Sequence, residues 1–346
     1  MTLLQLRYLA AIVDAGLNIT VAARQVGATQ PGLSKQLKQL EEELGFQLFQ
    51  RRGKALERLS PAGVQVLERA RAILAEAANI RTFAANHRGE ALGELRIATT
   101  HTQASFALPA PLAALRARFP QMRLDLAPLA EHEALEQLEQ GEADIAFVSG
   151  PERPETADLA VPIYRWDLVA LAPLDHPLAR ISGSPSLAML ASAPLVTYES
   201  ALPASSSFAR AFAAAGLQPR LACTARDSDL IKTYVRAGMG VGLLAEMAVT
   251  ENDSYARLFK LDGLFPSRTT WAVLRRDRVV RAAVLELLVT VAPHLPRQAL
   301  RQALDGNGAE RDWPEPPHWR ELSRLAAPPL GRFQPSSPLK LIASLG

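Results

Sequence analysis

Polar side chains that suit the binding of a small anion follow one another in the run Thr99-Thr100-His101-Thr102-Gln103. The run joins a predicted strand to a predicted helix, so its hydroxyl and amide groups meet free backbone N–H groups at the positive end of the helix dipole. This pattern indicates a site for a small anion or a carboxylate. On these residues alone, an ordinary hydroxyl-rich helix cap is the simpler interpretation, and His101 is more typical of a packing or hydrogen-bonding residue than of a catalyst.

Few other residues suit catalysis or metal binding. The six histidines never occur four residues apart, which disfavours a zinc site on a helix. The single cysteine, Cys223, permits neither an intrachain disulfide nor a multi-cysteine metal site. A nucleophile motif and a glycine-rich phosphate loop are also missing. An enzyme that uses His101 as a base is therefore disfavoured, and no metal or other cofactor is expected.

A second group of polar and basic side chains, near the amino terminus, suits nucleic-acid recognition. A helix predicted from Thr29 to about Leu44 turns a stripe of leucines toward a core, which leaves amide, hydroxyl and ammonium groups on its outer face. A predicted hairpin with a basic tip follows and would lie over backbone phosphates. The candidate DNA-binding residues are Thr29, Gln30, Pro31, Ser34, Lys35, Lys38, Arg51, Arg52 and Lys54.

Three predicted helices position these side chains. The first covers about residues 3–15, the second covers 19–26 behind the cap Asn18, and the third begins at Thr29 with Pro31 in its first turn. A glycine-containing turn between the second and third helices is typical of a helix-turn-helix, whose second helix enters the major groove. The alternative is a plain three-helix packing unit with a charged surface.

The segment after the hairpin predicts one long helix, from Pro61 to about Ala85, that would serve in dimerisation. Small and β-branched residues alternate along it at a spacing of three and four over three heptads, a pattern typical of two closely packed helices. The alternative is a helix packed against the body of its own chain. We expect the dimer, because a long helix with a narrow apolar stripe is marginal without a partner. The expected contact residues are Val66, Ala70, Ile73, Ala77 and Ile80.

The rest of the chain predicts an α/β body and a tail. Strands and helices alternate over residues 93–300, which predicts mostly parallel sheets in two lobes with a ligand crevice at the carboxyl ends of strands. Prolines crowd the last residues, which predicts a poorly ordered tail. The expected parts are a winged helix-turn-helix at 1–60, a linker helix and hinge at 61–92, lobe I at about 93–164 and 266–295, lobe II at about 165–265, and the tail at 301–346.

Composition agrees with this division. Residues 1–90 hold 12 Lys and Arg against 8 Asp and Glu, whereas residues 91–300 hold 20 against 22. A basic front on a slightly acidic body fits a nucleic-acid-binding head, although such an excess is also common on ordinary surfaces. The sequence contains no apolar run long enough to span a membrane and no signal peptide at its start, so we expect a cytoplasmic protein without a membrane partner.

The head resembles that of the LysR-type transcriptional regulators over about sixty residues. The resemblance rests on the run from Ala22 to Gln36, on Leu48-Phe49, and on Ser60-Pro61-Ala62-Gly63. It implies a winged helix-turn-helix, a linker helix and a two-lobed α/β effector domain similar to periplasmic binding proteins. It also implies a homo-oligomer, a dimer or a tetramer, that binds double-stranded promoter DNA and is not an enzyme.

Within that family, the body resembles the CysB-type branch, the regulators of cysteine biosynthesis and sulfur assimilation. The resemblance is clearest over residues 97–104 and 231–242. It implies an effector of the sulfate, thiosulfate or acetylserine type. The implied effector-binding positions fall on Thr100, Thr102, Gln103, Ser149 and Pro203.

The loop over residues 199–207 departs from that branch. Pro203 stands where the branch has a threonine hydroxyl facing the ligand, Ser205 replaces an arginine, and Glu199 adds negative charge. We therefore expect the identity of the effector or its affinity to differ. A regulator that senses another small carboxylate or an aromatic metabolite is the alternative.

Overall fold

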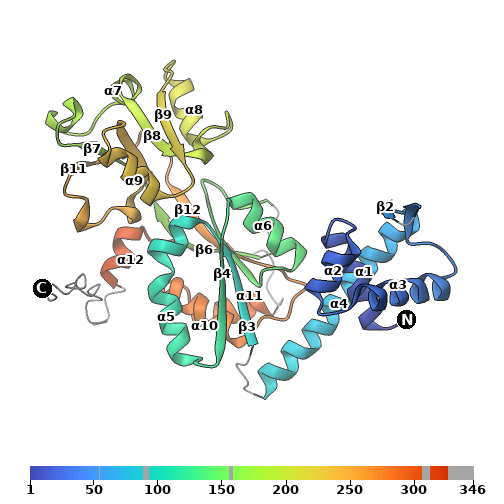
Figure 1. Cartoon of the computed structure of the whole chain (residues 1–346). Coiled ribbons are helices and arrows are strands. Elements are labelled where there is room, and N and C mark those ends of the chain that lie inside the picture. Colours follow the sequence, from blue (N-terminus) through green and yellow to red (C-terminus); the bar gives the residue numbers. More distant parts are fainter. Residues whose placement is uncertain (54, 89–92, 156–158, 306–311, 326–346) are drawn as a thin grey trace, which may run out of the picture.

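A small helical head, a long helix and a two-lobed α/β body make up the computed structural model (Figure 1). The structure describes residues 1–53, 55–88, 93–155, 159–305 and 312–325. Within these ranges, no helix is both long enough and apolar enough to cross a membrane.

Capping side chains fix the helix starts in the head. Thr2, Asn18 and Thr29 each accept a hydrogen bond from a backbone N–H in the first turn of the helix that follows. The three helices share one buried core, and a two-stranded hairpin, the wing, follows them. The elements are α1 (Leu3–Asp14), α2 (Ile19–Gln25), α3 (Gln30–Leu44), β1 (Phe49–Arg52) and β2 (Ala55–Leu59). The expected winged helix-turn-helix is confirmed.

The long helix α4 (Pro61–His87) starts in direct contact with the head. The Ser60 hydroxyl accepts a hydrogen bond from the Gly63 N–H at 2.9 Å. A Cβ at Gly63 would lie 2.0 Å from the carbonyl oxygen of Leu48, so only glycine allows this close approach. Two turns later Ala70 is buried in the core of the head. The first part of α4 is therefore built into the head.

Lobe I is a five-stranded sheet in the order β4-β3-β5-β12-β6, with helices on both faces (Figure 1). Only β12 runs against its neighbours, so the expectation of a mostly parallel sheet is correct. Helix α6 covers one face, and α5, α10 and α11 cover the other. The elements are β3 (Gly93–Thr99), α5 (Pro109–Arg118), β4 (Met122–Pro128), α6 (Glu131–Gln140), β5 (Ile145–Gly150), β6 (Leu159–Trp166), β12 (Arg268–Leu274), α10 (Ala282–Val291) and α11 (Arg297–Leu304).

Lobe II has the same plan, a five-stranded sheet in the order β11-β7-β10-β8-β9 in which only β7 runs against its neighbours. Helices α7 and α8 pack on one face and α9 on the other. The elements are β7 (Leu168–Pro173), α7 (Leu187–Ser192), β8 (Pro194–Tyr198), α8 (Ser207–Ala214), β9 (Arg220–Ala225), α9 (Ser228–Arg236), β10 (Val241–Ala245) and β11 (Ala256–Lys260). The chain crosses between the lobes twice, from β6 to β7 at Asp167 and from β11 back to β12.

The expectation of a poorly ordered tail from residue 301 is wrong for its first part. Helix α11 continues to Leu304 and buries Ala303 against lobe I. A short helix, α12 (Trp319–Leu325), then packs on the same lobe, where Leu322 is buried. Prolines prevent a long helix, but apolar side chains beside them still bury surface against the sheet. Residues 306–311 and 326–346 lie outside the described part of the chain.

Candidate nucleic-acid interface and ligand site

The outer face of α3 presents the polar side chains expected to meet DNA. Leu33, Leu37 and Leu40 are buried on the inner face of the helix. On the outer face, the Gln30 amide donates to the Ser34 hydroxyl at 3.3 Å. The side chains of Gln30, Pro31, Lys35 and Lys38 are exposed, Ser34 is half-buried, and Thr29 caps the helix. This face offers donors and acceptors of the kinds that contact bases and phosphates.

In the wing, Arg51 has a structural partner that sequence reasoning missed. The Arg51 guanidinium lies 3.2 Å from a carboxylate oxygen of Glu41, whose side chain is only 2% exposed. The Glu41 carboxylate also accepts a hydrogen bond from the Leu48 N–H at 2.8 Å. Arg51 therefore joins the wing to α3, whereas Arg52 is exposed. Lys54 falls outside the described residues.

The expected dimer seam divides into two parts along α4. Ala70 is buried in the core of its own head and half-buried Val66 packs against that core, so the head takes up much of the apolar surface expected to face a partner helix. Further along, Ile73 and Ile80 are exposed at 41% and 64%, with Ala77 between them half-buried. The periodic spacing was real, but the first part of the stripe serves the head because the close approach at Gly63 brings it there.

Another side of α4 is fastened to lobe I. The Asn79 amide donates to the Asp277 carbonyl at 2.8 Å and accepts from the Val279 N–H at 2.9 Å. One heptad later, Asn86 binds the Val280 carbonyl and the Ala282 N–H in the same way. The side of α4 with Asn79 and Asn86 thus packs on the body of its own chain, as the alternative interpretation of the sequence expected. The side with Ile73 and Ile80 is exposed.

Gln103 lies at the centre of a buried polar cluster in lobe I. Its amide nitrogen donates to the hydroxyls of Ser149 and Thr270 at 3.2 and 3.3 Å, and its amide oxygen accepts from the Tyr164 hydroxyl. Trp166 donates to the Thr270 hydroxyl from 3.2 Å. Burial raises the pKa of Tyr164, which therefore keeps its proton and remains a donor. The structure thus brings together two of the expected residues, Gln103 and Ser149.

Thr102 joins the two lobes. Its hydroxyl lies 3.2 Å from the Ser228 hydroxyl at the start of α9, and Ser228 lies 2.7 Å from the Tyr198 hydroxyl at the end of β8. Tyr198 also accepts a hydrogen bond from the Ala245 N–H, and burial raises its pKa. Sequence reasoning missed Tyr198 and Ser228. Both stand beside strand ends of lobe II, and that position was the available signal.

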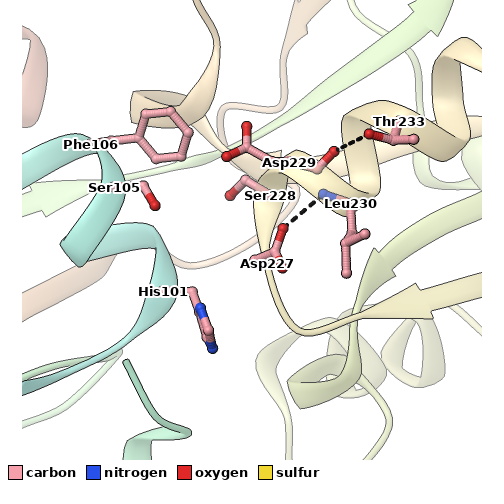
Figure 2. A pocket seen from close by; sticks show the side chains of 8 residues that line it. All are labelled: His101, Ser105, Phe106, Asp227, Ser228, Asp229, Leu230 and Thr233. Carbon is pink, nitrogen blue, oxygen red and sulfur yellow. Dashed lines mark hydrogen bonds between the residues drawn. The ribbon is translucent and has the colours of Figure 1, made fainter. Parts of the chain in front are cut away.

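A cavity of about 370 Å³ opens beside these hydroxyls, between the turn after β3 and the first turn of α9 (Figure 2). Its acidic side chains are Asp227, which caps α9, and Asp229, which pairs with Lys232 at 3.2 Å. Arg268 does not line the cavity: it donates to the Ser149 carbonyl and pairs with Glu131 in lobe I. The lining residues are His101, Ser105, Phe106, Asp227, Ser228, Asp229, Leu230 and Thr233.

Two of the expected effector positions lie apart from this arrangement. Thr100 is half-buried just after β3, where its carbonyl accepts from the Ala104 N–H. Pro203 is exposed in the loop between β8 and α8 and does not line the cavity. The loop therefore turns Pro203 to solvent, and its place in the site was predicted from the resemblance alone.

Comparison with known proteins identifies both domains. Residues 3–64 match the model of the bacterial regulatory helix-turn-helix proteins of the lysR family, and residues 88–296 match the LysR substrate binding domain. The chain belongs to the LysR family. It is therefore a DNA-binding transcriptional regulator with an effector-binding domain, and not an enzyme.

Relatives within the family are similar over most of the chain. The HTH-type transcriptional regulator CysB of Haemophilus influenzae is 36% identical over 304 residues, which cover 86% of this chain and 92% of that protein. The regulator cbl of Escherichia coli K12 is 37% identical over 299 residues, covering 86% and 94%. The crystal structure of the cofactor-binding domain of Cbl superposes with a TM-score of 0.56 at 36% identity, covering 62% of this chain and 95% of that domain.

Proposed function

We propose that this LysR-family regulator controls genes of sulfur and cysteine metabolism through a small effector bound between its lobes. The similarity to CysB and Cbl supports the class of genes. The observation that carries the effector site is the hydroxyl cluster of Thr102, Ser228 and Tyr198, because it joins the two lobes and its member Ser228 lines the cavity. Effectors of the sulfate, thiosulfate or acetylserine type fit its hydrogen-bonding groups.

The charges around the cavity favour one member of this set. The carboxylates of Asp227 and Asp229 repel a purely anionic ligand, whereas an ammonium group would pair with them. The backbone N–H groups at the start of α9, where Ser228 lines the cavity, suit a carboxylate. A zwitterion such as O-acetylserine satisfies both requirements, and we expect it to bind more tightly than sulfate.

Coupling between effector and DNA follows from how the lobes and α4 are fastened. A ligand that replaces the Thr102–Ser228 contact favours a different closure of the lobes, and a ligand shifts a conformational equilibrium by its difference in affinity for the two states. Asn79 and Asn86 fasten lobe I to α4, so a movement of lobe I carries the helix and the head with it.

The DNA contacts and the oligomer are parts of the same proposal. The outer face of α3 enters the major groove of promoter DNA with Gln30, Ser34 and Lys35, and the wing places Arg52 near the phosphates. A second copy of the chain packs on the exposed side of α4 at Ile73 and Ile80, which sets two heads on successive half-sites. Both a dimer and a tetramer are compatible with this contact.

Another effector class has one observation in its favour. Phe106 and Leu230 line the cavity, and the loop that holds Pro203 lacks the threonine and the arginine of the CysB-type branch. Apolar lining of this kind would suit a small carboxylate or an aromatic metabolite. Such a ligand would still use the hydroxyl cluster for its carboxylate.

Replacing Thr102 by valine tests the site. We expect Thr102→Val to weaken effector binding by at least about tenfold, because a hydroxyl is lost from a buried polar cluster. The measurement is calorimetric titration of both proteins with sulfate, thiosulfate, O-acetylserine and N-acetylserine. Thr290→Val is the control, since Thr290 makes a comparable hydrogen bond on the exposed side of α10. Equal affinities of Thr102→Val and the wild type for a ligand that binds would refute the site.

A further inference from the structure

A segment beyond the family match lies along the edge of lobe I. The Arg165 N–H donates to the Pro317 carbonyl at 2.9 Å, and the Arg165 side chain pairs with Glu315 at 2.6 Å. Leu322 is buried in the core of lobe I. We call residues 315–322 the C-terminal strap. The substrate-binding-domain match ends at residue 296, so the strap is an addition to that domain.

The strap runs beside the point where the chain passes from lobe I to lobe II. At this point the Asp167 N–H donates to the Glu246 carboxylate at 3.1 Å, and the Glu246 N–H donates to the Asp167 carbonyl at the same distance. Glu246 follows β10 and belongs to lobe II. Ser267, on the second crossing, donates to the Asp167 carboxylate at 2.5 Å. Both crossings therefore meet at Asp167, and we call this point between lobes I and II the hinge.

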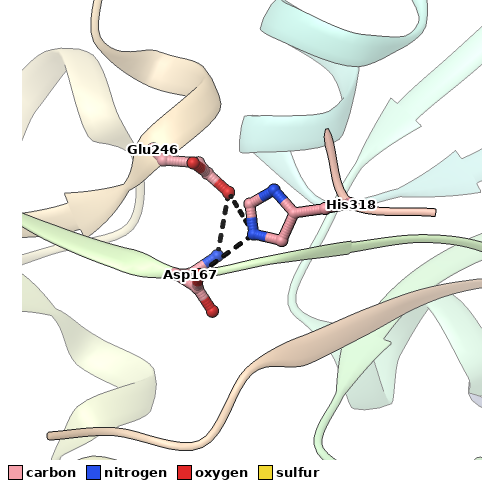
Figure 3. Close-up of side chains that lie close together, drawn as sticks. All are labelled: Asp167, Glu246 and His318. Carbon is pink, nitrogen blue, oxygen red and sulfur yellow. Dashed lines mark hydrogen bonds and ion pairs between the residues drawn. The ribbon is translucent and has the colours of Figure 1, made fainter. Parts of the chain in front are cut away.

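Two side chains of the strap, His318 and Arg320, bind the hinge directly, and Figure 3 shows His318 beside Asp167 and Glu246. The Nε2 atom of His318 lies 3.0 Å from Asp167 and 3.2 Å from Glu246, and Arg320 pairs with the second oxygen of Glu246 at 2.5 Å. The Glu246 side chain is only 6% exposed. Hydrogen bonds to charged groups are stronger when water is largely excluded, so these contacts resist separation of lobe II from the strap.

A divalent metal is the competing occupant, because Asp167, Glu246 and His318 place three ligand atoms within 4.8 Å of one another. The hydrogen bonds favour a ring hydrogen of His318, and not a metal ion, between these side chains. The Arg320 backbone N–H donates to Nδ1 of His318 at 3.3 Å, so Nδ1 is an acceptor and the ring hydrogen lies on Nε2, the atom that a metal would need. The Arg320 cation also occupies one oxygen of Glu246.

The strap also contacts the cluster around Gln103. The Trp319 ring packs on the Tyr164 ring with centroids 5.0 Å apart, and the Tyr164 hydroxyl donates to the Gln103 amide oxygen. One short segment thus contacts both the hinge and Tyr164, which bonds Gln103, the residue next to Thr102.

From these contacts we propose that the C-terminal strap is a built-in latch on the hinge. It holds Glu246 of lobe II against lobe I and thereby opposes relative movement of the lobes. Weakening the latch frees that movement and changes the concentration of effector needed for a response. The latch stands on the hinge contacts alone and does not require the proposed effector.

Hydrogen–deuterium exchange on the full-length protein tests the latch. We expect Arg320→Met and Glu246→Gln each to raise exchange at the amides of Asp167 and Glu246 by about fivefold or more, because each removes one side of a charge-assisted pair. Arg320→Lys retains the charge and should restore most of the protection. Arg297→Met is the matched control: Arg297 pairs with Glu286 at 2.9 Å, and both residues belong to lobe I.

Several outcomes would overturn the latch. One is equal exchange at the hinge amides in Arg320→Met, Glu246→Gln and the control. Another is a rise of the same size at the amides of β3, which would make the strap a contributor to general stability. If Zn²⁺ protected the hinge of the wild type but not that of His318→Ala, the three side chains would form a metal site.

An effector titration separates this proposal from the proposed function. O-acetylserine is titrated into the wild type and Arg320→Met, and we expect a change in affinity of at least about threefold. A change below that size, with binding intact in both proteins, would contradict the coupling of latch and site. If O-acetylserine bound neither protein, the proposed effector would be wrong, while the exchange data would still decide the latch.

Discussion

Single residues in this chain depend on partners that lie far away in the sequence. Thr102, Gln103 and Ser149 could be identified because they stand at predicted strand ends or match a known pattern. Ser228 lies 126 positions from Thr102, and only the packing of lobe II on lobe I brings their hydroxyls together. The pair of buried Glu41 with exposed Arg51 was missed for the same reason, since its partners belong to different elements of the head.

Glu41 offers a test of such a pair. Replacing it by leucine removes the acceptor of the Leu48 N–H and the partner of Arg51, and we expect the free energy of unfolding of the head to fall by about 2–3 kcal/mol. Urea unfolding followed by circular dichroism measures the change. Glu42→Leu is the control, because the Glu42–Lys38 pair is exposed and should contribute less than about 1 kcal/mol. Similar losses in the two variants would show that the buried carboxylate has no special role.

At the scale of elements, caps and periodicity predicted most helices, and long-range contacts decided the rest. Ser60 and Pro61 correctly predicted the start of α4. The apolar stripe of the helix did not predict which of its sides contacts the head, which contacts lobe I and which is exposed. The same limit explains α12. A proline-rich sequence suggested disorder, because the pattern did not show that Trp319 and Leu322 would find surface on lobe I.

The outer face of α3 should govern DNA affinity. We expect Lys35→Ala to weaken binding to promoter DNA by about tenfold and Ser34→Ala by less, because a phosphate contact carries charge and a hydroxyl contact does not. Fluorescence anisotropy with a duplex from the upstream region of the gene measures both. Arg210→Ala removes an exposed cation from α8 of lobe II and serves as the control. Unchanged affinity in Lys35→Ala would exclude α3 from the groove.

The exposed side of α4 should govern assembly. We expect Ile80→Lys to shift the protein toward smaller species in sedimentation velocity, because a charge replaces an apolar side chain at the proposed contact with a second copy. Leu258→Lys places the same charge on β11, where Leu258 is 48% exposed, and should leave the distribution unchanged. The seam would be refuted by an Ile80→Lys protein that sediments like the wild type.

For the whole molecule, the order of strands and helices predicted two α/β lobes. The helix-turn-helix pattern near the amino terminus, with which the basic charge of the first 90 residues agrees, predicted which end meets nucleic acid. The alternation also predicted the prevailing strand direction. It did not predict β12 and β7 as the antiparallel strands, because the crossings between lobes that reverse them leave no local signal. The contacts at Asp167 likewise required the complete fold.

The uneven charge of the chain should make DNA binding steeply dependent on salt. Release of counterions from several phosphates predicts a loss of affinity on the order of a thousandfold between about 50 and 200 mM salt. Anisotropy titrations over this range give the slope directly. A nearly flat dependence would mean that the basic head makes few phosphate contacts.

The way α4 is anchored has a geometric consequence. Its first turns are embedded in the head through Gly63 and Ala70, and its later turns are pinned to lobe I through Asn79 and Asn86. The number of residues between Ala70 and Asn79 therefore fixes the angle of the head, about the axis of α4, relative to lobe I. One residue inserted there would rotate the reading face about 100° around the shaft, whereas seven would return it to within about 20°. The anchored helix therefore sets the direction in which the DNA-reading face points as well as its distance from lobe I.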